Sequence, residues 1–258
     1  MPSPTLLEYL NDSYKFGATA NVVKLEELPG QDENSPIAGK RFSIILDTTI
    51  FYPQGGGQPF DTGTIISQNG KFIVKETRFN DGIVFHTGEY ESGTFHENDK
   101  VELNVNTDRR MLHCRLHSAG HLIDLAMINS GYKLIPTKGY HFPDGPYVEY
   151  AGDIPIEQRN ELCIRLEEEI KKLIAENTEV RDFIVSTVEE LKKYCDHIPD
   201  YLPKDKPIRV VSIANYHCPC GGTHVKKLSD LPQIKVSKIK VKGGNVRVSY
   251  NFATGIFT

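Results

Sequence analysis

Short apolar runs separated by polar turn residues recur through residues 1–106. The clearest runs are β-branched or aromatic and lie between Gly, Asn and Asp turns: RFSIILDTTIFY, TGTIISQ, KFIVKETRF, GIVFHTG and KVELNV. Short runs of this kind, separated by turn residues, are typical of barrels and sandwiches. We therefore predict a small β-barrel-like domain over residues 1–106.

The pattern changes after Thr107. Apolar residues at every third or fourth position predict a helix over residues 108–130 and an amphipathic helix after Pro155. The other predicted elements are a hairpin over residues 132–151, strands at VRDFIVS and IRVVSIA, a short helix from Thr187 to about Cys195 opened by a Thr187/Glu190 capping box, and a C-terminal hairpin turning at Gly243 and Gly244. This mixture predicts an α+β domain over residues 107–258, with a mainly antiparallel sheet and packed helices.

Composition and charge limit the classes of function. Of the 258 residues, 39% are apolar and 25% are charged, which excludes a disordered chain and a collagen. The sequence pI of about 6.1 excludes a globally basic protein, so nucleic-acid binding requires a local basic patch. No apolar run approaches the ~20 residues of a membrane helix, and the N-terminal MPSPTLLEYLND is unlike a secretory signal. We expect a cytoplasmic protein.

Two histidines share one face of the first predicted helix. In RLHSAGHLIDLA, His117 and His121 stand at positions i and i+4, whose side chains are neighbours on a helix. The pair is able to present two imidazoles to one metal ion. Ser118 occupies the place of the glutamate in the metalloprotease pattern H-E-x-x-H, which argues against that peptidase mechanism. Taken alone, the pair is also compatible with two helical histidines that bind no metal.

A second group of metal-ligand residues lies far along the chain. In NYHCPCGGTHV, Cys220 and His224 flank two glycines that allow a tight backbone path. Thiolate and imidazole are natural zinc ligands, and zinc commonly takes four. The predicted set is His117, His121, Cys220 and His224. Rival sets replace Cys220 with Cys218, or His224 with His217. Four protein ligands are typical of a closed structural site, so catalysis would require a weak ligand or a fifth position.

These segments together resemble a known family. HSAGH at residues 117–121, followed by CGGTH at residues 220–224, resembles the editing domain shared by alanyl-tRNA synthetase and threonyl-tRNA synthetase. The approach DRRMLHCRLHSAGHL and the upstream segment TTIFYPQGGGQPFDTGTI are similar to the same family. The freestanding AlaX-type alanyl-tRNA editing proteins combine both parts, and the chain length resembles that of their medium form.

The resemblance implies a hydrolase that removes serine, and in some members glycine, from tRNA(Ala). A synthetase pocket built for alanine discriminates poorly against serine and glycine, so a second hydrolytic site supplies the missing selectivity. Zinc would orient the substrate and activate water. Thr137, in KLIPTKGYHF, lies near the position where the family places a threonine that reads the serine hydroxyl. Alanine would leave that partner unpaired, at a cost of about 1–3 kcal/mol. The alternative for Thr137 is an ordinary strand residue.

Gly55, Gly56, Gly57 and Gln58 form a second candidate feature. A phosphate-binding P-loop requires G-x-x-x-x-G-K-[ST] before a helix, whereas Pro59 and then a strand-like run follow here, which argues against nucleotide hydrolysis. The resemblance implies that this loop packs beside the editing pocket and helps to hold the tRNA end. The alternative is a tight β-turn.

The candidate phosphate contacts are Arg109, Arg110, Lys238, Lys240 and Lys242. Period-two spacing puts the three lysines on one face of a C-terminal strand, but the neighbouring apolar residues fit this register only in part, which predicts a bulge. Phosphate contacts would make binding sensitive to salt. The alternative is a solvated edge strand that resists aggregation.

The sequence therefore predicts a two-domain, zinc-dependent deacylase that acts on tRNA(Ala) carrying a wrong amino acid and spares alanyl-tRNA(Ala). Two alternatives stay open. A non-catalytic RNA-binding module with a structural zinc would bind tRNA without turnover. A zinc hydrolase of another class would act on a small ester or amide in preference to tRNA.

Overall fold

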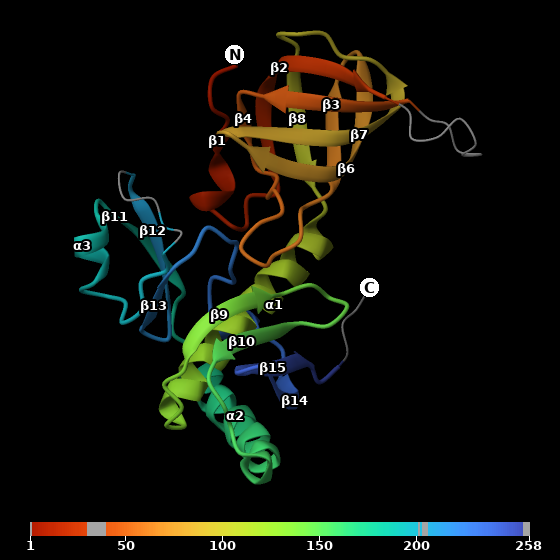
Figure 1. Cartoon of the computed structure of the whole chain (residues 1–258). Coiled ribbons are helices and arrows are strands. Elements are labelled where there is room, and N and C mark those ends of the chain that lie inside the picture. Colours follow the sequence, from red (N-terminus) through yellow and green to blue (C-terminus); the bar gives the residue numbers. More distant parts are fainter. Residues whose placement is uncertain (1, 30–39, 201, 203–205, 255–258) are drawn as a thin grey trace. The chain divides into compact units, whose positions relative to one another are not determined.

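The computed structural model describes residues 2–29, 40–200, 202 and 206–254. Contacts divide the chain into two compact units, Met1–Gly55 with Pro59–Met111 and Gly56–Gln58 with Leu112–Thr258. The first unit is a closed β-barrel, and the second combines antiparallel sheets with helices (Figure 1). This arrangement confirms the predicted α+β fold with a barrel at the N-terminal end.

Six antiparallel strands close the barrel in the order β2-β3-β7-β6-β5-β8. Their bounds are Gly17–Leu28 (β2), Arg41–Leu46 (β3), Gly63–Ser67 (β5), Gly70–Asn80 (β6), Ile83–Gly93 (β7) and Lys100–Val105 (β8). In β8 every second side chain, those of Val101, Leu103 and Val105, is buried in the barrel core, as the period of two requires. Two short strands, Leu6–Leu7 (β1) and Thr48–Thr49 (β4), form a parallel pair, and Glu8–Leu10 forms a 3-10 turn (η1).

The barrel strand that the sequence pattern did not single out is β2. Its segment GATANVVKLEEL is rich in small and charged residues, and Ala20 and Val22 are its buried side chains. The strand pairs with β3 along one edge and with β8 along the other. Its conformation follows from these two neighbours more than from its own propensity, because strand preference depends strongly on context.

A four-stranded antiparallel sheet in the order β14-β15-β10-β9 forms the centre of the second unit. The elements are Thr107–Asn129 (α1), Ile135–Tyr140 (β9), Tyr147–Ala151 (β10), Ile156–Glu176 (α2), Ile234–Lys242 (β14) and Asn245–Phe252 (β15). Val148 and Tyr150 from the sheet share one buried cluster with Leu116 of α1 and Leu166 of α2, so both helices cover one face of the sheet (Figure 1). Both predicted long helices and both predicted hairpins are confirmed.

The apolar stripe of α2 explains why this helix forms and where it packs. Leu162, Leu166, Ile170 and Leu173 recur at helical spacing and are buried. Burial of each side chain contributes roughly 2 kcal/mol. The helix ends at Asn177, whose backbone is left-handed with φ of 47°, a conformation that asparagine tolerates at a helix C-terminus.

A three-stranded sheet, β11-β12-β13, completes the second unit. Its elements are Arg181–Val185 (β11), Val188–Leu191 (α3), Ile208–Ile213 (β12) and Tyr216–Pro219 (β13), and Leu228–Asp230 forms a 3-10 turn (η2). Thr187 caps α3 by accepting a hydrogen bond from the backbone N–H of Glu190 over 3.1 Å, as predicted. The helix is shorter than predicted, because i to i−3 bonds at Lys193 and Tyr194 tighten the chain before Cys195. In the described part of the chain, no helix is both long and apolar enough to cross a membrane.

Candidate metal centre

Two segments far apart in the chain bring the predicted ligands together. His117 and His121 lie one turn apart on α1, while Cys220 and His224 lie in the loop after β13. One ligand atom from each of the four residues lies within 4.8 Å of every other. We call this set the metal cluster. Three imidazoles and one thiolate form a donor set able to hold a metal ion, and it is chemically suited to zinc.

Hydrogen bonds behind two of the rings hold their Nε2 atoms close to the sulfur of Cys220. His117 Nδ1 donates to Oε1 of Gln58 over 2.8 Å, which leaves Nε2 unprotonated, 3.5 Å from Sγ of Cys220. His224 Nδ1 is hydrogen-bonded to Oγ of Ser118 over 3.3 Å, and its Nε2 lies 3.3 Å from the same sulfur. Metal-binding histidines characteristically donate their second N–H in this way. Ser118, which stands where a metalloprotease has glutamate, therefore helps to position the ring of His224.

His121 has an acidic partner behind its ring. Its Nδ1 lies 3.7 Å from one carboxylate oxygen of Asp124, and the hydroxyl of Tyr150 donates to the other over 2.7 Å. Tyr150 thus fixes the carboxylate, and the carboxylate faces the imidazole. A carboxylate behind a histidine sets the tautomer and increases the basicity of the ligating nitrogen. Sequence reasoning missed Asp124, although its place one turn after His121 on α1 was a usable signal.

The two thiols next to the cluster differ in acidity. Burial raises the pKa of Cys218 above its ordinary value. Burial acts on Cys220 in the same direction, but its interaction with His121 and the N–H of Gly222, 3.4 Å away, lower the pKa of this thiol. Because the thiolate is the form that binds metal, Cys220 is the better ligand. Cys218 lies 3.3 Å from Nδ1 of His121, outside the four-residue set.

The rival ligand His217 lies in a different environment. Its ring packs against Phe183 and Tyr194, with centroid distances of 6.0 and 5.8 Å. His217 and Cys218 are consecutive residues of β13, and consecutive side chains in a strand point to opposite faces. The arrangement therefore brings together His224, and not His217, with the other three ligands.

Gly222 and Arg209 shape the loop that carries Cys220. A Cβ atom on Gly222 would lie 2.2 Å from Cε1 of His117, so the close approach of this loop to the ring requires glycine. Arg209, in β12, donates from Nη1 to the carbonyl oxygens of Cys220 and Gly222 over 2.9 and 3.0 Å. Its Nε lies 3.3 Å from a carboxylate oxygen of Asp182. An arginine inside the apolar run IRVVSIA was the signal in the sequence for this role.

The Gly-rich loop reaches the metal cluster through Gln58. Gly56 and Gly57 have φ values of 52° and 77°, and a Cβ on Gly57 would lie 2.3 Å from a carbonyl oxygen of β9. The carbonyl of Gly57 accepts the N–H of His141 over 2.8 Å. The turn thus packs directly against the end of β9. Gln58 is fully buried, and its Nε2 donates to Oγ1 of Thr223 over 2.8 Å. The Gly-rich loop is therefore both a tight turn and a segment that packs beside the metal cluster.

His141 is a buried residue at the cluster that sequence reasoning missed. Its ring stacks on His117 with centroids 4.4 Å apart. His141 Nδ1 donates to the hydroxyl oxygen of Tyr250 over 2.6 Å, because that hydroxyl donates its own hydrogen to the carbonyl of Leu116 over 2.9 Å. Burial and the charge of His121 lower the pKa of His141 to about 3, so the ring is neutral. The signal was its place beside a predicted strand, in the same segment as Thr137.

Thr137 lies at a bulge in β9. Its neighbours pair with β10, while Thr137 itself has no cross-strand partner. The side chain is exposed, and its hydroxyl donates to the carbonyl oxygen of Glu149 over 3.1 Å. Within the described part of the chain, this is the one hydrogen bond of the Thr137 side chain. A bulge commonly redirects a side chain, and here it exposes the hydroxyl on the strand that ends beside the cluster.

The buried position of Arg110 contradicts one of the predicted phosphate contacts. Its guanidinium is fully buried, pairs with Asp61 through Nε at 2.8 Å, and donates to two backbone carbonyls. A buried charge requires such pairing, and no phosphate reaches this group, so the prediction for Arg110 is wrong. Arg109 is half-buried, and its guanidinium lies over the ring of Phe60, 5.2 Å from the centroid.

Lys238, Lys240 and Lys242 extend from the exposed face of β14. The predicted bulge is confirmed, because the register with β15 shifts between Val236 and Lys238. The shift lies before the three lysines, so they share the face opposite to the buried Val236 and Ile239. A single inserted residue therefore reconciles the lysine spacing with the apolar pattern of the strand.

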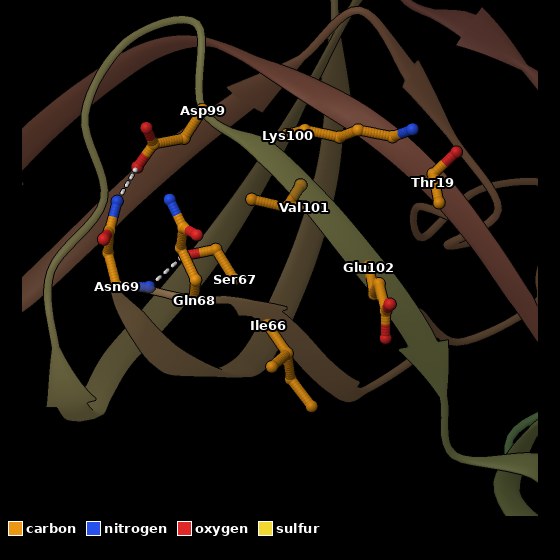
Figure 2. A pocket seen from close by; sticks show the side chains of 9 residues that line it. All are labelled: Thr19, Ile66, Ser67, Gln68, Asn69, Asp99, Lys100, Val101 and Glu102. Carbon is orange, nitrogen blue, oxygen red and sulfur yellow. Dashed lines mark hydrogen bonds between the residues drawn. The ribbon is translucent and has the colours of Figure 1, made fainter.

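A recess of about 530 Å³ opens in the barrel, apart from any cluster residue (Figure 2). Asn69 in its lining donates from its side chain to Asp99 over 3.2 Å, and its backbone N–H donates to Ser67 over 3.0 Å. The residues that line the recess include neither histidine nor cysteine. The recess therefore lacks the ligand types that distinguish the metal cluster.

Comparisons with known proteins identify the family. Residues 7–109 match the model of class II tRNA synthetases (A), and residues 208–248 match the second additional domain of threonyl and alanyl tRNA synthetase. The alanyl-tRNA editing protein AlaX-M of Methanosarcina barkeri is 30% identical over 215 residues, which cover 80% of this chain and 87% of that protein. The chain belongs to the AlaX family of alanyl-tRNA editing proteins.

Other relatives of this chain include a longer AlaX protein and an alanine–tRNA ligase. AlaX-L of Pyrococcus horikoshii is 31% identical over 212 residues, and the match spans 80% of this chain but half of that protein. The alanine–tRNA ligase of Clostridioides difficile is 30% identical over 243 residues, covering 91% of this chain and 26% of the ligase. The resemblance to AlaX that was predicted from HSAGH, CGGTH and the Gly-rich segment is thus confirmed.

Proposed function

We propose that this chain is a zinc-dependent trans-editing deacylase that hydrolyses the aminoacyl ester of mischarged tRNA(Ala), chiefly seryl-tRNA(Ala) and also glycyl-tRNA(Ala). The metal cluster carries the proposal, because four ligand atoms from two remote segments converge within 4.8 Å. Membership of the AlaX family supports the substrate, since its relatives are named for alanyl-tRNA editing. A tRNA substrate would place the protein in the cytoplasm.

The residues around the cluster fit a zinc ion. Gln58 and Ser118 are hydrogen-bonded to the Nδ1 atoms of two imidazoles, so their Nε2 atoms, 3.5 and 3.3 Å from the sulfur of Cys220, would be the ones that bind zinc. Bound zinc would polarise the ester and lower the pKa of water. The chain's own contribution is to keep three ring orientations and one thiolate fixed before the substrate arrives.

Thr137 supplies the selectivity in this proposal. Its hydroxyl donates to the carbonyl of Glu149, so its oxygen lone pairs are available to accept a hydrogen bond from the hydroxyl of a seryl group. The methyl group of alanine offers no donor, and binding it would leave this polar group unpaired at a cost of about 1–3 kcal/mol. Alanyl-tRNA(Ala) would then escape hydrolysis.

Cations of the second predicted domain, residues 107–258, would contact the tRNA backbone. The candidates that keep this role are Arg109, Lys238, Lys240 and Lys242. The lysines are exposed on one strand face, which suits contacts with successive phosphates. Each phosphate contact makes binding weaker as salt concentration rises.

One observation favours a second function, a tRNA-binding module in which zinc is structural. All four positions of the cluster are protein side chains, and closed four-ligand sites are typical of structural zinc. In that case the protein would bind tRNA, and removal of the metal would unfold the second unit.

The deciding experiment compares the hydrolysis of seryl-, glycyl- and alanyl-tRNA(Ala) with and without a chelator. The deacylase proposal expects seryl-tRNA(Ala) to be hydrolysed much faster than alanyl-tRNA(Ala), with loss of activity in chelator and recovery with added zinc. Equal rates for serine and alanine would overturn the specificity. Binding of tRNA with no turnover of any of the three would favour the structural zinc.

A further inference from the structure

One face of the sheet β14-β15-β10-β9 is covered by helices, and the other carries aromatic and basic side chains. Val148, Tyr150, Val246 and Val248 belong to the buried core on the helical side. Side chains alternate along a strand, so the residues between them point to the opposite face. Cross-strand register sets two adjacent rows on that open face, one of Lys238, Ser249, Tyr147 and Tyr140 and one of Lys240, Arg247, Glu149 and Lys138.

Three rings on and beside this face lie nearly parallel. Tyr140 and Tyr147 have centroids 5.2 Å apart and planes inclined by 17°, and Tyr140 and Phe142 have centroids 4.5 Å apart and planes inclined by 14°. The guanidinium carbon of Arg247 lies 3.9 Å from the ring centroid of Tyr147. We call these four residues the stacking platform. All three rings are partly exposed, outside the buried core.

Hydrogen bonds hold the platform in place before any ligand binds. The hydroxyl of Tyr140 donates to a carboxylate oxygen of Asp144 over 3.0 Å, and Nη2 of Arg247 donates to Glu149 over 3.1 Å. A surface ordered in this way loses little side-chain entropy on binding. Planar rings fixed in parallel, with a guanidinium over one of them, therefore form a ready surface for another flat group.

The open face is positively charged although the chain has a net charge of −4. It carries five cations, Lys138, Lys238, Lys240, Lys242 and Arg247. The acidic groups next to the platform are Glu149 and Asp144, and each is hydrogen-bonded to a platform residue. Charge and ring chemistry together favour a ligand that is both anionic and planar.

The platform adjoins the metal cluster through the end of β9. Tyr140 and Phe142 flank His141 in the sequence, and the His141 ring stacks on His117 of the cluster at 4.4 Å. Alternation directs His141 to the side opposite its two neighbours. A ligand that lies along the platform therefore extends to the same strand end at which the cluster lies.

We propose that the stacking platform binds the unpaired nucleotides at the 3′ end of the tRNA. Unpaired bases stack on aromatic rings and on arginine, and lysines beside them neutralise phosphates. Bases inside a duplex already stack on one another and offer no free face, so the platform selects a single strand. The identity of the RNA as tRNA rests on the proposed function, whereas the preference for single-stranded RNA does not.

The test measures binding of the full chain to a short fluorescent single-stranded RNA that ends in CCA and carries no amino acid. Tyr147→Ala should weaken binding about 5- to 150-fold, the range that stacking of one base supports. Tyr147→Phe keeps the ring and should bind within about twofold of the wild type. Lys240→Ala should weaken binding and reduce its salt dependence, whereas Lys235→Ala, which removes a lysine paired with Glu167 at 2.8 Å, should do neither.

Controls separate stacking from loss of fold. Tyr194→Ala removes an exposed ring elsewhere in the second unit and should leave binding unchanged. If Tyr147→Ala has a lower melting temperature than the wild type, the test is repeated with Phe142→Leu and Arg247→Gln, which change the two ends of the platform. Both variants should weaken binding. The proposal is overturned if these variants bind as the wild type does, if only the lysines matter, or if the same RNA binds equally well as a duplex. Normal RNA binding without deacylation would defeat the proposed function and leave the platform standing.

Discussion

The imidazole of His117 donates a hydrogen bond of 2.8 Å to the side-chain amide of Gln58, 59 residues earlier in the chain. The amide oxygen also accepts the backbone N–H of Thr223 over 3.0 Å, which fixes the orientation of the amide. Thr223 immediately precedes the ligand His224, so Gln58 contacts both ligand-bearing segments. The Gly-rich segment is therefore part of the support of the metal cluster.

Replacing Gln58 tests this support. Gln58→Leu removes the acceptor for His117 Nδ1 and leaves the N–H of Thr223 without its partner. We expect metal affinity to fall about 10- to 100-fold, as is typical when the hydrogen-bond partner of a ligand is lost. Competition with a chelator measures this affinity. Gln58→Glu keeps an acceptor and should retain most of it, and Gln54→Leu, in the same loop, is the control. Equal affinity in the Leu variant and the wild type would contradict the role of Gln58.

The two neighbouring thiols provide a matched pair of variants. Cys220→Ser removes the sulfur that lies 3.3 and 3.5 Å from two histidine nitrogens, and metal affinity should fall further than in Gln58→Leu. Cys218→Ser should retain metal, because Cys218 lies outside the set and burial raises the pKa of its thiol. When cobalt is bound in place of zinc, a thiolate–cobalt charge-transfer absorption band shows that a thiolate is a ligand. Loss of that band in Cys218→Ser, with its retention in Cys220→Ser, would reverse the assignment.

Sequence patterns were most informative where one local rule decided the structure. The spacing of His117 and His121 on a helix and the glycines before His224 were enough to predict the four residues that form the cluster, with Cys218 and His217 as rivals. Strand alternation in β13 separates His217 from the cluster, whereas the positions and acidities of the two thiols separate Cys218 from Cys220. The direction in which each of those side chains points can be read only from the folded structure.

Residues that act through tertiary contacts were not predictable in the same way. Arg110 has the charge of a phosphate ligand, but its burial against Asp61 depends on segments far from it in the chain. His141 follows a predicted strand and is ordinary in sequence, yet it stacks on His117. β2 carries little apolar alternation and becomes a strand because two neighbours pair with it.

The buried pair of Arg110 and Asp61 predicts a large effect on stability. Asp61→Asn removes the negative partner and leaves a buried guanidinium charge without compensation, so we expect the free energy of unfolding to fall by about 3–5 kcal/mol. Chemical denaturation measures the change. The control is Glu91→Gln, which breaks an exposed pair with Lys71 and should cost about 0–1 kcal/mol. Similar losses in the two variants would show that the Arg110 pair is not a structural element of the barrel.

His86 makes the barrel sensitive to acid. Its Nδ1 donates to the carbonyl of Ile44 over 3.0 Å, and its Nε2 accepts the hydroxyl hydrogen of Thr49 over 2.8 Å, so the ring is neutral. Burial lowers the pKa of His86 to about 4, against 6.5 for an ordinary histidine. Between these values the unfolded chain binds a proton that the folded chain does not. Stability therefore falls as the pH drops from 6.5 toward 4.

The expected contribution of His86 over this pH window is about 3 kcal/mol. Unfolding free energies measured across the window should decline less steeply in His86→Gln than in the wild type. His96→Gln, which replaces an exposed ring, should keep the wild-type slope. An unchanged slope in His86→Gln would show that this ring does not cause the acid sensitivity.

The most direct test of the central claim adds zinc stepwise to metal-free protein while metal occupancy and seryl-tRNA(Ala) hydrolysis are followed in the same sample. If the four side chains form one metal centre that supports deacylation, both quantities rise together and reach their plateaus at one zinc per chain. Hydrolysis at full rate without metal, or full occupancy with no hydrolysis, would contradict the account.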